Sequence, residues 1–513
     1  MLKHVLTVGG WTMISRILGF VRDMLIAAIL GAGPVADAFF VALKLPNLFR
    51  RLFGEGAFNA AFVPAFSHIL TDDGPEAARR FARETFAVMT FWLAALTLAG
   101  ELAMPWLMVV LAPGFASDPS KFALAVELSR ITFPYLLLIC LAALVSGVLN
   151  GMERFIAASA SYVVFNVVSI ACMLGLTAYV PTAGHALSWG VTIAGVLQLG
   201  LLMVAAHRAG MTLTLPRPRL TPPIRLLLRR MAPGLVGAGV TQLNLAVDVV
   251  IASLLPAGTV SLLYYADRIQ QLPLGVIGTA VGTAMLPMLS RQVRAGEDAA
   301  AIDTQNRAIE YALFLTLPAA AALMVSAFPI VWGLFGRGAF GVEDAHLTAQ
   351  ALAAYAVGLP GFVLVKVLAP GFFARGDTAM PVRIGLAAVG LNLALNVAFM
   401  VPLRHMGPAL ATSLAAMANV AGLAVVLARR GQLRPDAALR RRLMGLLGAT
   451  AAMAAVLFVA QSWLFDVPRH GILSLLALGA LVSLGLLVFI VAAQLFGAVD
   501  LRRLLAGRLR SGA

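Results

Sequence analysis

The chain has 513 residues, of which 61% are hydrophobic and 12% charged, and its formal net charge is +15. Soluble domains carry roughly 25% charged residues, so this chain has too few charges to cover soluble domains, and lipid must surround much of its exterior. The basic residues stand in short clusters between apolar runs, without interleaved aromatic residues for base stacking, so the positive charge does not indicate a nucleic-acid partner.

Long apolar runs predict the elements of the fold. Runs such as Leu136–Val148 and Leu473–Val491 are unbroken and lack the alternation of a barrel strand. Only helices and closed barrels satisfy the backbone in lipid, so we expect an all-α polytopic membrane protein with about fourteen transmembrane helices. The expected spans, in chain order, are 5–31, 35–68, 80–111, 123–149, 155–180, 185–207, 225–254, 259–290, 305–335, 346–373, 380–402, 406–428, 441–464 and 471–497.

The basic residues also predict the orientation of these spans. Lys3 and His4 precede an apolar run that charged residues interrupt, so the first span is expected to be retained rather than removed as a signal peptide. Arginine clusters at 79–83, 208–230, 429–442 and 502–510 all fall on one side if the N-terminus is inside. The positive-inside rule then places both termini in the cytoplasm.

An internal repeat predicts two lobes. Residues 28–67 share a pattern with 252–290, and Phe133-Pro134 matches Leu359-Pro360, at offsets between 223 and 226. An offset of six spans, an even number, gives a parallel pseudo-two-fold repeat, an architecture typical of alternating access around a site between the lobes. We expect an N-lobe at 1–208, a basic, proline-rich cytoplasmic linker at 209–224, a C-lobe at 225–430 and two further helices within 431–513.

Charged residues inside the predicted spans are the candidates for function, because a charge at mid-bilayer costs a few kcal/mol or more and needs water, a partner or a ligand. Spacings of seven place Arg16 with Asp23, Ser15 with Arg22, and Asp37 with Lys44 on shared helix faces. These residues could tie helices together as ion pairs or extend to the interface. The four arginines Arg16, Arg22, Arg50 and Arg268 exceed what pairing needs, and clustered guanidinium groups favour a phosphate-bearing ligand between the lobes.

A second set of polar residues allows two interpretations. Asp248, Asn392, Asn396 and Thr412 could hold sodium through carboxylate, amide and hydroxyl oxygens. The asparagines could equally form hydrogen bonds between helices, as polar groups in membranes commonly do. We find no His, Cys and Glu set with metal-ligand spacing and no phosphate-binding glycine loop, so we expect no catalytic residues, no cofactor other than this sodium and no ATPase motor.

Several charged motifs resemble one known family. The runs are SRILGFVRD at 15–23, ADAFF at 36–40, KLPN at 44–47, RRLFGEGAF at 50–58, YYADR at 264–268 and VKVLAPGF at 365–372. Together they resemble the MurJ (MviN) lipid II flippases of the multidrug/oligosaccharidyl-lipid/polysaccharide (MOP) transporter superfamily. The resemblance implies two six-helix lobes around a central cationic cavity, with the last two spans forming a groove for the polyprenyl tail.

The resemblance also implies which residues act. The family's functional positions match Arg16, Arg22, Asp23, Asp37, Arg50, Glu55 and Arg268, to which we add Ser15, Lys44 and Asn166 as candidate substrate-binding residues. Some members bind sodium at positions similar to Asp248, Asn392, Asn396 and Thr412. Asn396 stands where sodium-binding members are expected to carry an acidic residue, and Gln271 stands where relatives carry a glutamate.

The function implied is translocation of lipid II, an undecaprenyl-diphosphate-linked peptidoglycan precursor, from the inner to the outer leaflet. We expect a monomer in contact with membrane lipids and with the cell-wall synthesis machinery. Three alternatives stay open: a flippase for another polyprenyl-linked oligosaccharide, a MATE-like multidrug antiporter, and a membrane scaffold or receptor. The arginines disfavour the antiporter, whose substrates are mostly cationic, and in a scaffold the charges would serve only as ion pairs.

Overall fold

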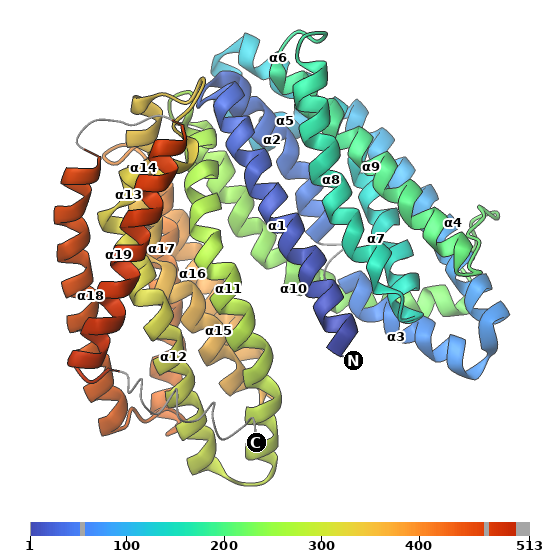
Figure 1. The fold of residues 1–513 in the computed structure, drawn as a ribbon. Coiled ribbons are helices and arrows are strands. Elements are labelled where there is room, and N and C mark those ends of the chain that lie inside the picture. Colours follow the sequence, from blue (N-terminus) through green and yellow to red (C-terminus); the bar gives the residue numbers. More distant parts are fainter. Residues whose placement is uncertain (1, 52–56, 466–470, 499–513) are drawn as a thin grey trace. The chain divides into compact units, whose positions relative to one another are not determined.

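The computed structural model describes residues 2–51, 57–465 and 471–498, and these residues form helices without any strand (Figure 1). The first half contains α1 (Leu2–Leu30), α2 (Pro34–Phe49), α3 (Ala57–Asp72), α4 (Gly74–Leu102), α5 (Met104–Leu111), η2 (Pro113–Ser117), α6 (Pro119–Thr132), α7 (Tyr135–Gly151), α8 (Phe155–Leu176), α9 (Ala183–Arg208) and α10 (Pro222–Ser253). The second half contains α11 (Thr259–Arg294), α12 (Asp298–Val325), α13 (Ala327–Phe335), α14 (Val342–Val357), α15 (Leu359–Phe373), α16 (Ala379–Phe399), α17 (Met406–Arg429), α18 (Ala437–Leu464) and α19 (Ile472–Leu495).

The predicted all-α membrane class is confirmed. Within the described residues, ten segments are long and apolar enough to cross a membrane. Each of the fourteen predicted ranges overlaps either one helix or two consecutive helices. The number fourteen itself stays a prediction.

The breaks between consecutive helices follow the internal repeat. Ala103 separates α4 from α5, and Ser326 separates α12 from α13, 223 positions later. The break between α6 and α7 falls at Phe133-Pro134, and that between α14 and α15 at Gly358, just before Pro360. Proline interrupts the helical hydrogen bonding, so the matched prolines account for two matched breaks.

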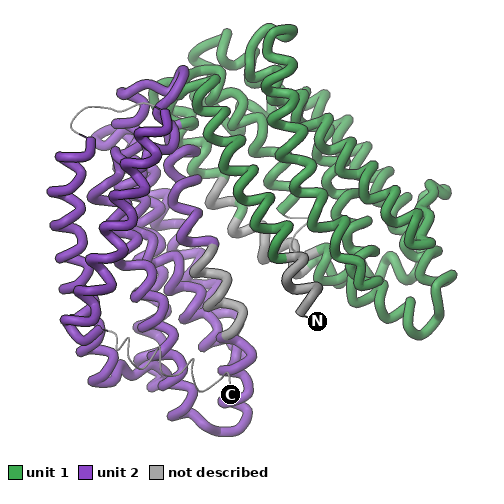
Figure 2. Tube along the Cα trace, in the orientation of Figure 1, with its two compact units in different colours: residues 1–261 green, residues 262–513 purple. Residues whose placement is uncertain are grey.

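The chain divides into two compact units, residues 1–261 and 262–513 (Figure 2). The first residues of α11, through Ser261, belong to the first unit, and the rest of the helix belongs to the second. The lobe boundaries predicted from the repeat, at 208 and 225, stay a prediction.

In the first unit, α1 packs on α8, α8 and α7 pack on α9, and α2 packs on α6. Gly195 permits the contact of α9 with α7, because a Cβ there would lie 2.6 Å from the Tyr135 ring. The rings of Phe58, Phe62 and Phe66 stack along α3 and are fully buried. Every helix that carries a candidate residue of this unit is therefore held by its neighbours.

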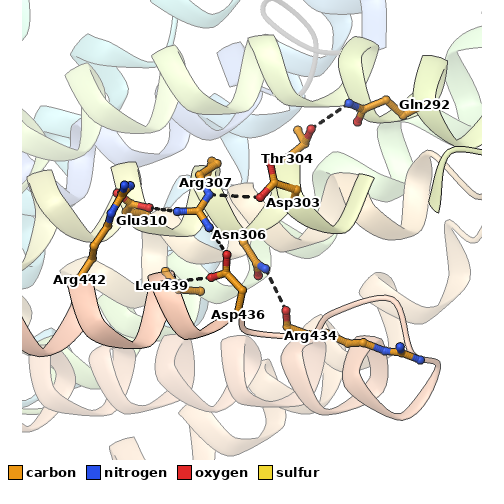
Figure 3. Close-up of polar contacts among 10 residues, drawn as sticks. All are labelled: Gln292, Asp303, Thr304, Asn306, Arg307, Glu310, Arg434, Asp436, Leu439 and Arg442. Carbon is orange, nitrogen blue, oxygen red and sulfur yellow. Dashed lines mark hydrogen bonds and ion pairs between the residues drawn. The ribbon is translucent and has the colours of Figure 1, made fainter. Parts of the chain in front are cut away.

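In the second unit, α12 packs against α14, α15 and α18, and α18 pairs with α19. An ion-pair network joins α12 to the start of α18 (Figure 3). The Glu310 carboxylate lies 2.5 Å from both Arg307 and Arg442. Asp436 pairs with Arg307 and also accepts the backbone N–H of Leu439 at 2.7 Å, which caps α18. The helix α18 is therefore attached to α12 by charge as well as by packing.

Candidate functional site

The first candidate cluster lies where α1 packs on α8. Arg22 donates to the Asp23 carboxylate from Nη2 at 2.8 Å and from Nε at 3.2 Å. Its guanidinium carbon lies 5.4 Å from the centre of the Phe165 ring, a cation–π distance. Asp23 is fully buried and 12% of the Arg22 side chain is exposed, so the carboxylate and the ring hold the guanidinium in one orientation.

Ser15 and Asn166 meet along the same pair of helices. Asn166 Nδ2 donates to the Ser15 carbonyl at 3.1 Å and contacts the Ser15 hydroxyl at 3.3 Å. It also donates to the Tyr162 carbonyl within α8 at 3.1 Å. Two residues predicted as candidates from separate arguments are therefore in contact. Arg16, the next residue on α1, is exposed.

Arg50 belongs to the same region of the first unit. It follows the last residue of α2, and its Nε donates to Asn47 at 3.3 Å. Both Arg50 and Arg22 interact electrostatically with the buried Tyr135 on α7. Two of the four predicted arginines therefore belong to one region of the first unit.

Asp37 forms a different kind of site. Its side chain is 1% exposed, and Lys121 Nζ on α6 lies 2.7 Å from Oδ2. The backbone N–H of Gly258 also donates to Oδ2 at 2.7 Å, while Ser261 donates to Oδ1 from its N–H and its hydroxyl, each at 2.9 Å. Four donors thus surround one buried carboxylate. We call Asp37, Lys121, Gly258 and Ser261 the Asp37 latch, because they join α2, α6 and the start of α11.

Backbone geometry favours this latch. Gly258 has φ +95°, which only glycine adopts readily, and it turns its N–H toward Asp37 just before α11 begins. The positive end of the α11 dipole therefore adds to the ammonium of Lys121 in stabilising the carboxylate. Lys121 Nζ also lies 4.1 Å from the centre of the Phe115 ring. Lys44, predicted to share the face of Asp37, is half-buried further along α2.

Sequence reasoning missed the partners of Asp37. Lys121 is not among the predicted candidates, and only 7% of its side chain is exposed. One usable signal existed, because the chain contains only four lysines and arginine supplies its other strong bases. The pKa of lysine shifts readily when the side chain is buried, so a buried lysine that stays charged needs an acidic partner. A rare lysine beside a predicted span therefore indicates a nearby carboxylate.

The predicted sodium residues are divided between the two units. Asp248 is half-buried on α10 in the first unit, whereas Asn392, Asn396 and Thr412 lie on the adjacent helices α16 and α17 of the second. Both asparagines are buried, and Asn396 Nδ2 donates to Asn392 Oδ1 at 2.6 Å. One oxygen predicted as a cation ligand thus accepts an amide hydrogen bond in this structure, and the sodium site stays a prediction. No set of three His, Cys, Asp or Glu residues suited to a metal occurs in the described chain.

Two further candidates complete the predicted set. Arg268 is half-buried on α11 in the second unit, next to Asp267, whose carboxylate accepts from Gln271. Glu55 lies outside the described residues, as do Gly54 and Gly56 of the same motif.

Solved structures with a similar fold are membrane transporters. One is a lipid II flippase MurJ in an inward closed conformation, with TM-score 0.78 and 24% identity over 95% of this chain and 98% of that one. Another is an inward-facing multidrug MATE transporter of the MOP superfamily, with TM-score 0.67 and 14% identity over 85% of this chain and 99% of that one. The chain therefore shares its fold with these membrane transporters.

The sequence assigns the chain within that class. The family model described as "Lipid II flippase MurJ" matches residues 26–474. A probable lipid II flippase MurJ of Rhizobium tropici is 43% identical over 98% of this chain and 95% of its own length. A probable lipid II flippase MurJ of Rhizobium meliloti is 46% identical over 90% of this chain and 87% of its own length. The lipid II flippase MurJ of Burkholderia cenocepacia is 34% identical over 89% of each chain. The chain belongs to the lipid II flippase MurJ family.

Proposed function

We propose that this protein carries lipid II from the inner to the outer leaflet of the bacterial cytoplasmic membrane. The observation that carries the proposal is the family match over residues 26–474, in a chain whose membrane helices contain the charged cluster of Arg22, Asp23 and Arg50. Moving a lipid between leaflets makes and breaks no covalent bond, so we assign no catalytic residue.

The cationic cluster is suited to the diphosphate of such a lipid. A guanidinium fork binds phosphate oxygens in pairs, and Asp23 and Phe165 fix the fork of Arg22 before a ligand arrives. We propose that Arg16 and Arg50 contribute further positive charge. We assign to Ser15 and Asn166 the placement of α1 against α8, since their hydrogen bonds join these helices.

We propose that Arg268 of the second unit binds the same headgroup. It is half-buried on an apolar helix, where an arginine is costly unless it serves a partner or a ligand. Alternation between inward-open and outward-open states then passes the headgroup through, while the tail stays in lipid beside α18 and α19.

The Asp37 latch suggests how one of these states is held. It fixes the start of α11 to α2 and α6, and α11 continues from the first unit into the second. We propose that these bonds stabilise one conformational state and break in the other, with Lys121 available to pair with Asp37 in both.

The energy source follows from the charge of the cargo. With both termini in the cytoplasm, as the arginine clusters favour, a diphosphate moves outward down the membrane potential, gaining about 2.3 kcal/mol per charge per 100 mV. Sodium coupling stays a prediction, tested by replacing sodium with potassium in a transport assay. We also propose that the protein works as a monomer beside the enzymes that consume lipid II.

The deciding experiment measures lipid II on the outer leaflet of cells whose own flippase is switched off and that express this chain. We expect restored exposure with the wild type, loss with Arg268→Ala, and retention with Arg291→Ala, an exposed arginine of the same helix. A well-inserted wild type that restores nothing would redirect the proposal to another polyprenyl-linked glycan. Normal flipping by Arg268→Ala would remove that residue from the site.

A further inference from the structure

A groove of about 770 Å³ lies on the first unit, apart from the cationic cluster. It is formed by one face of α6, the beginning of α9, the residues between α8 and α9, and the beginning of α5. Its walls are mainly apolar and include Phe122, Val126, Ile131, Val180 and Trp189. A groove of this size accommodates a small amphiphile.

Two opposite charges line the same groove. Glu127 and Arg130 are both exposed and stand three residues apart on α6, which makes them neighbours about 5–6 Å apart at Cβ. His185 is almost fully buried, with Nε2 3.2 Å from the Glu127 carboxylate and Nδ1 2.8 Å from the Thr182 hydroxyl. The groove therefore combines a carboxylate, a guanidinium and an apolar wall.

Exposed aromatic side chains mark this groove. It runs along α6 from Phe122 to Ile131 and reaches the beginning of α9, where Trp189 lines it, while Trp106 and Tyr179 follow and precede the lining residues Pro105 and Val180 in the chain, and all three rings are exposed. Exposed Trp and Tyr gather where lipid headgroups meet the hydrocarbon, because their rings are apolar and their N–H and O–H groups are polar.

We propose that this groove binds a membrane phospholipid whose headgroup carries both a phosphate and a primary ammonium, as in phosphatidylethanolamine. Arg130 binds the phosphate, Glu127 binds the ammonium, and the upper acyl chain packs on Val126 and Trp189. An anionic headgroup without an ammonium would leave its charge facing Glu127. The charges of the groove therefore match a zwitterion, and the proposal does not depend on the cargo of the transporter.

The same helix connects the groove with the Asp37 latch. Phe122 and Glu127 of α6 face the groove, while Lys121 of α6 binds Asp37. A lipid bound on the groove side packs against α6 and stabilises the position from which Lys121 reaches the carboxylate. The phospholipid thus acts as a support for the latch as well as a ligand.

The binding test uses native mass spectrometry of the full chain titrated with phosphatidylethanolamine or phosphatidylglycerol. We expect the wild type to bind the ethanolamine lipid more tightly, and Glu127→Gln to lower that affinity about tenfold with little effect on the glycerol lipid. Arg130→Gln is expected to weaken both, and Glu343→Gln, an exposed carboxylate of the second unit, neither. Equal wild-type affinity for the two lipids, or an unchanged Glu127→Gln, would overturn the proposal.

A second measurement locates the lipid even if these variants fold poorly. Phospholipids with brominated acyl chains quench nearby tryptophan fluorescence in reconstituted vesicles. We expect brominated ethanolamine lipid to quench the wild type more than brominated glycerol lipid, and this difference to disappear when Trp106→Phe and Trp189→Phe are combined. A difference that persists in this double variant would place the lipid elsewhere and refute the assignment of the groove.

Discussion

The Asp37 latch gives the sharpest prediction, because Asp37 has other hydrogen-bond donors besides Lys121, and the two members of the pair should therefore differ in how much stability their removal costs. Asp37→Asn leaves the ammonium of Lys121, 7% exposed, without a carboxylate. Removing one member of a buried ion pair costs about 3–5 kcal/mol, because the other charge stays buried without compensation. Lys121→Met leaves the carboxylate with its bonds to Gly258 and Ser261, so we expect a smaller loss of about 1–3 kcal/mol.

The double variant separates pairing from general damage. Asp37→Asn combined with Lys121→Met leaves no uncompensated charge, so it should be more stable than Asp37→Asn alone. Thermal unfolding in detergent can be followed with a thiol-reactive dye, because Cys140 is buried and Cys172 partly buried in the folded chain. Asp73→Asn is the control, since this exposed carboxylate makes no capping hydrogen bond. Equal losses in the two single variants, or losses that simply add in the double variant, would refute this account of the latch.

Three further predictions test other parts of the molecule. Arg22→Lys keeps the charge but loses the guanidinium fork, so we expect lipid II transport to fall about tenfold at equal abundance, and unchanged transport would exclude bidentate binding. Arg442→Gln should loosen α18 from α12, which spin labels on the two helices would report as a longer distance than in the wild type. The control is Arg441→Gln, an exposed neighbour, which should leave the distance unchanged. A wild-type distance in Arg442→Gln would show that packing alone holds α18. Hydrogen bonds from the Met380 N–H and from Arg430 lower the pKa of the Asp377 carboxyl in the folded chain. The ionised carboxylate therefore stabilises the fold above its ordinary pKa of about 4, and this stabilisation is lost as the pH falls through the lowered pKa of the folded state. Asp377→Asn should therefore unfold earlier than the wild type at pH 7 and together with it at a pH of about 2, and a gap that persists in acid would contradict this.

The membrane helices were predictable because a span needs only a long enough run of apolar residues, and such a run can be read directly along the sequence. A run of apolar residues long enough to cross must be helical, and the matched prolines Pro134 and Pro360 mark breaks that the structure places at the same points of the two halves. The shared helix face of Asn392 and Asn396 was predictable for the same reason, since four residues make about one turn, and their hydrogen bond confirms it.

Partners across helices could not be predicted in this way. A charge in a membrane span indicates that some partner or ligand exists, but helical spacing identifies only neighbours on the same helix. Spacing of seven suggested Arg16 for Asp23, whereas the bonded arginine is its neighbour Arg22, whose long side chain turns back to the carboxylate. It suggested Lys44 for Asp37, whereas the bonded ammonium is that of Lys121, 84 positions away in the chain.

This difference separates the predicted charges into two kinds. Asp37 receives four donors, from Lys121 on α6 and from Gly258 and Ser261 at the start of α11, and a carboxylate so fully engaged has little capacity left for a ligand. Arg16 is exposed, and Arg22 is fixed by a carboxylate and an aromatic ring, which leaves a guanidinium ordered in advance for an anion. A sequence pattern that treats all these residues as one binding set therefore combines a buried carboxylate with four bonded donors and the arginines that we propose bind the ligand. Substitutions at Asp37 should act on the balance of states, and those at Arg22 on the cargo itself.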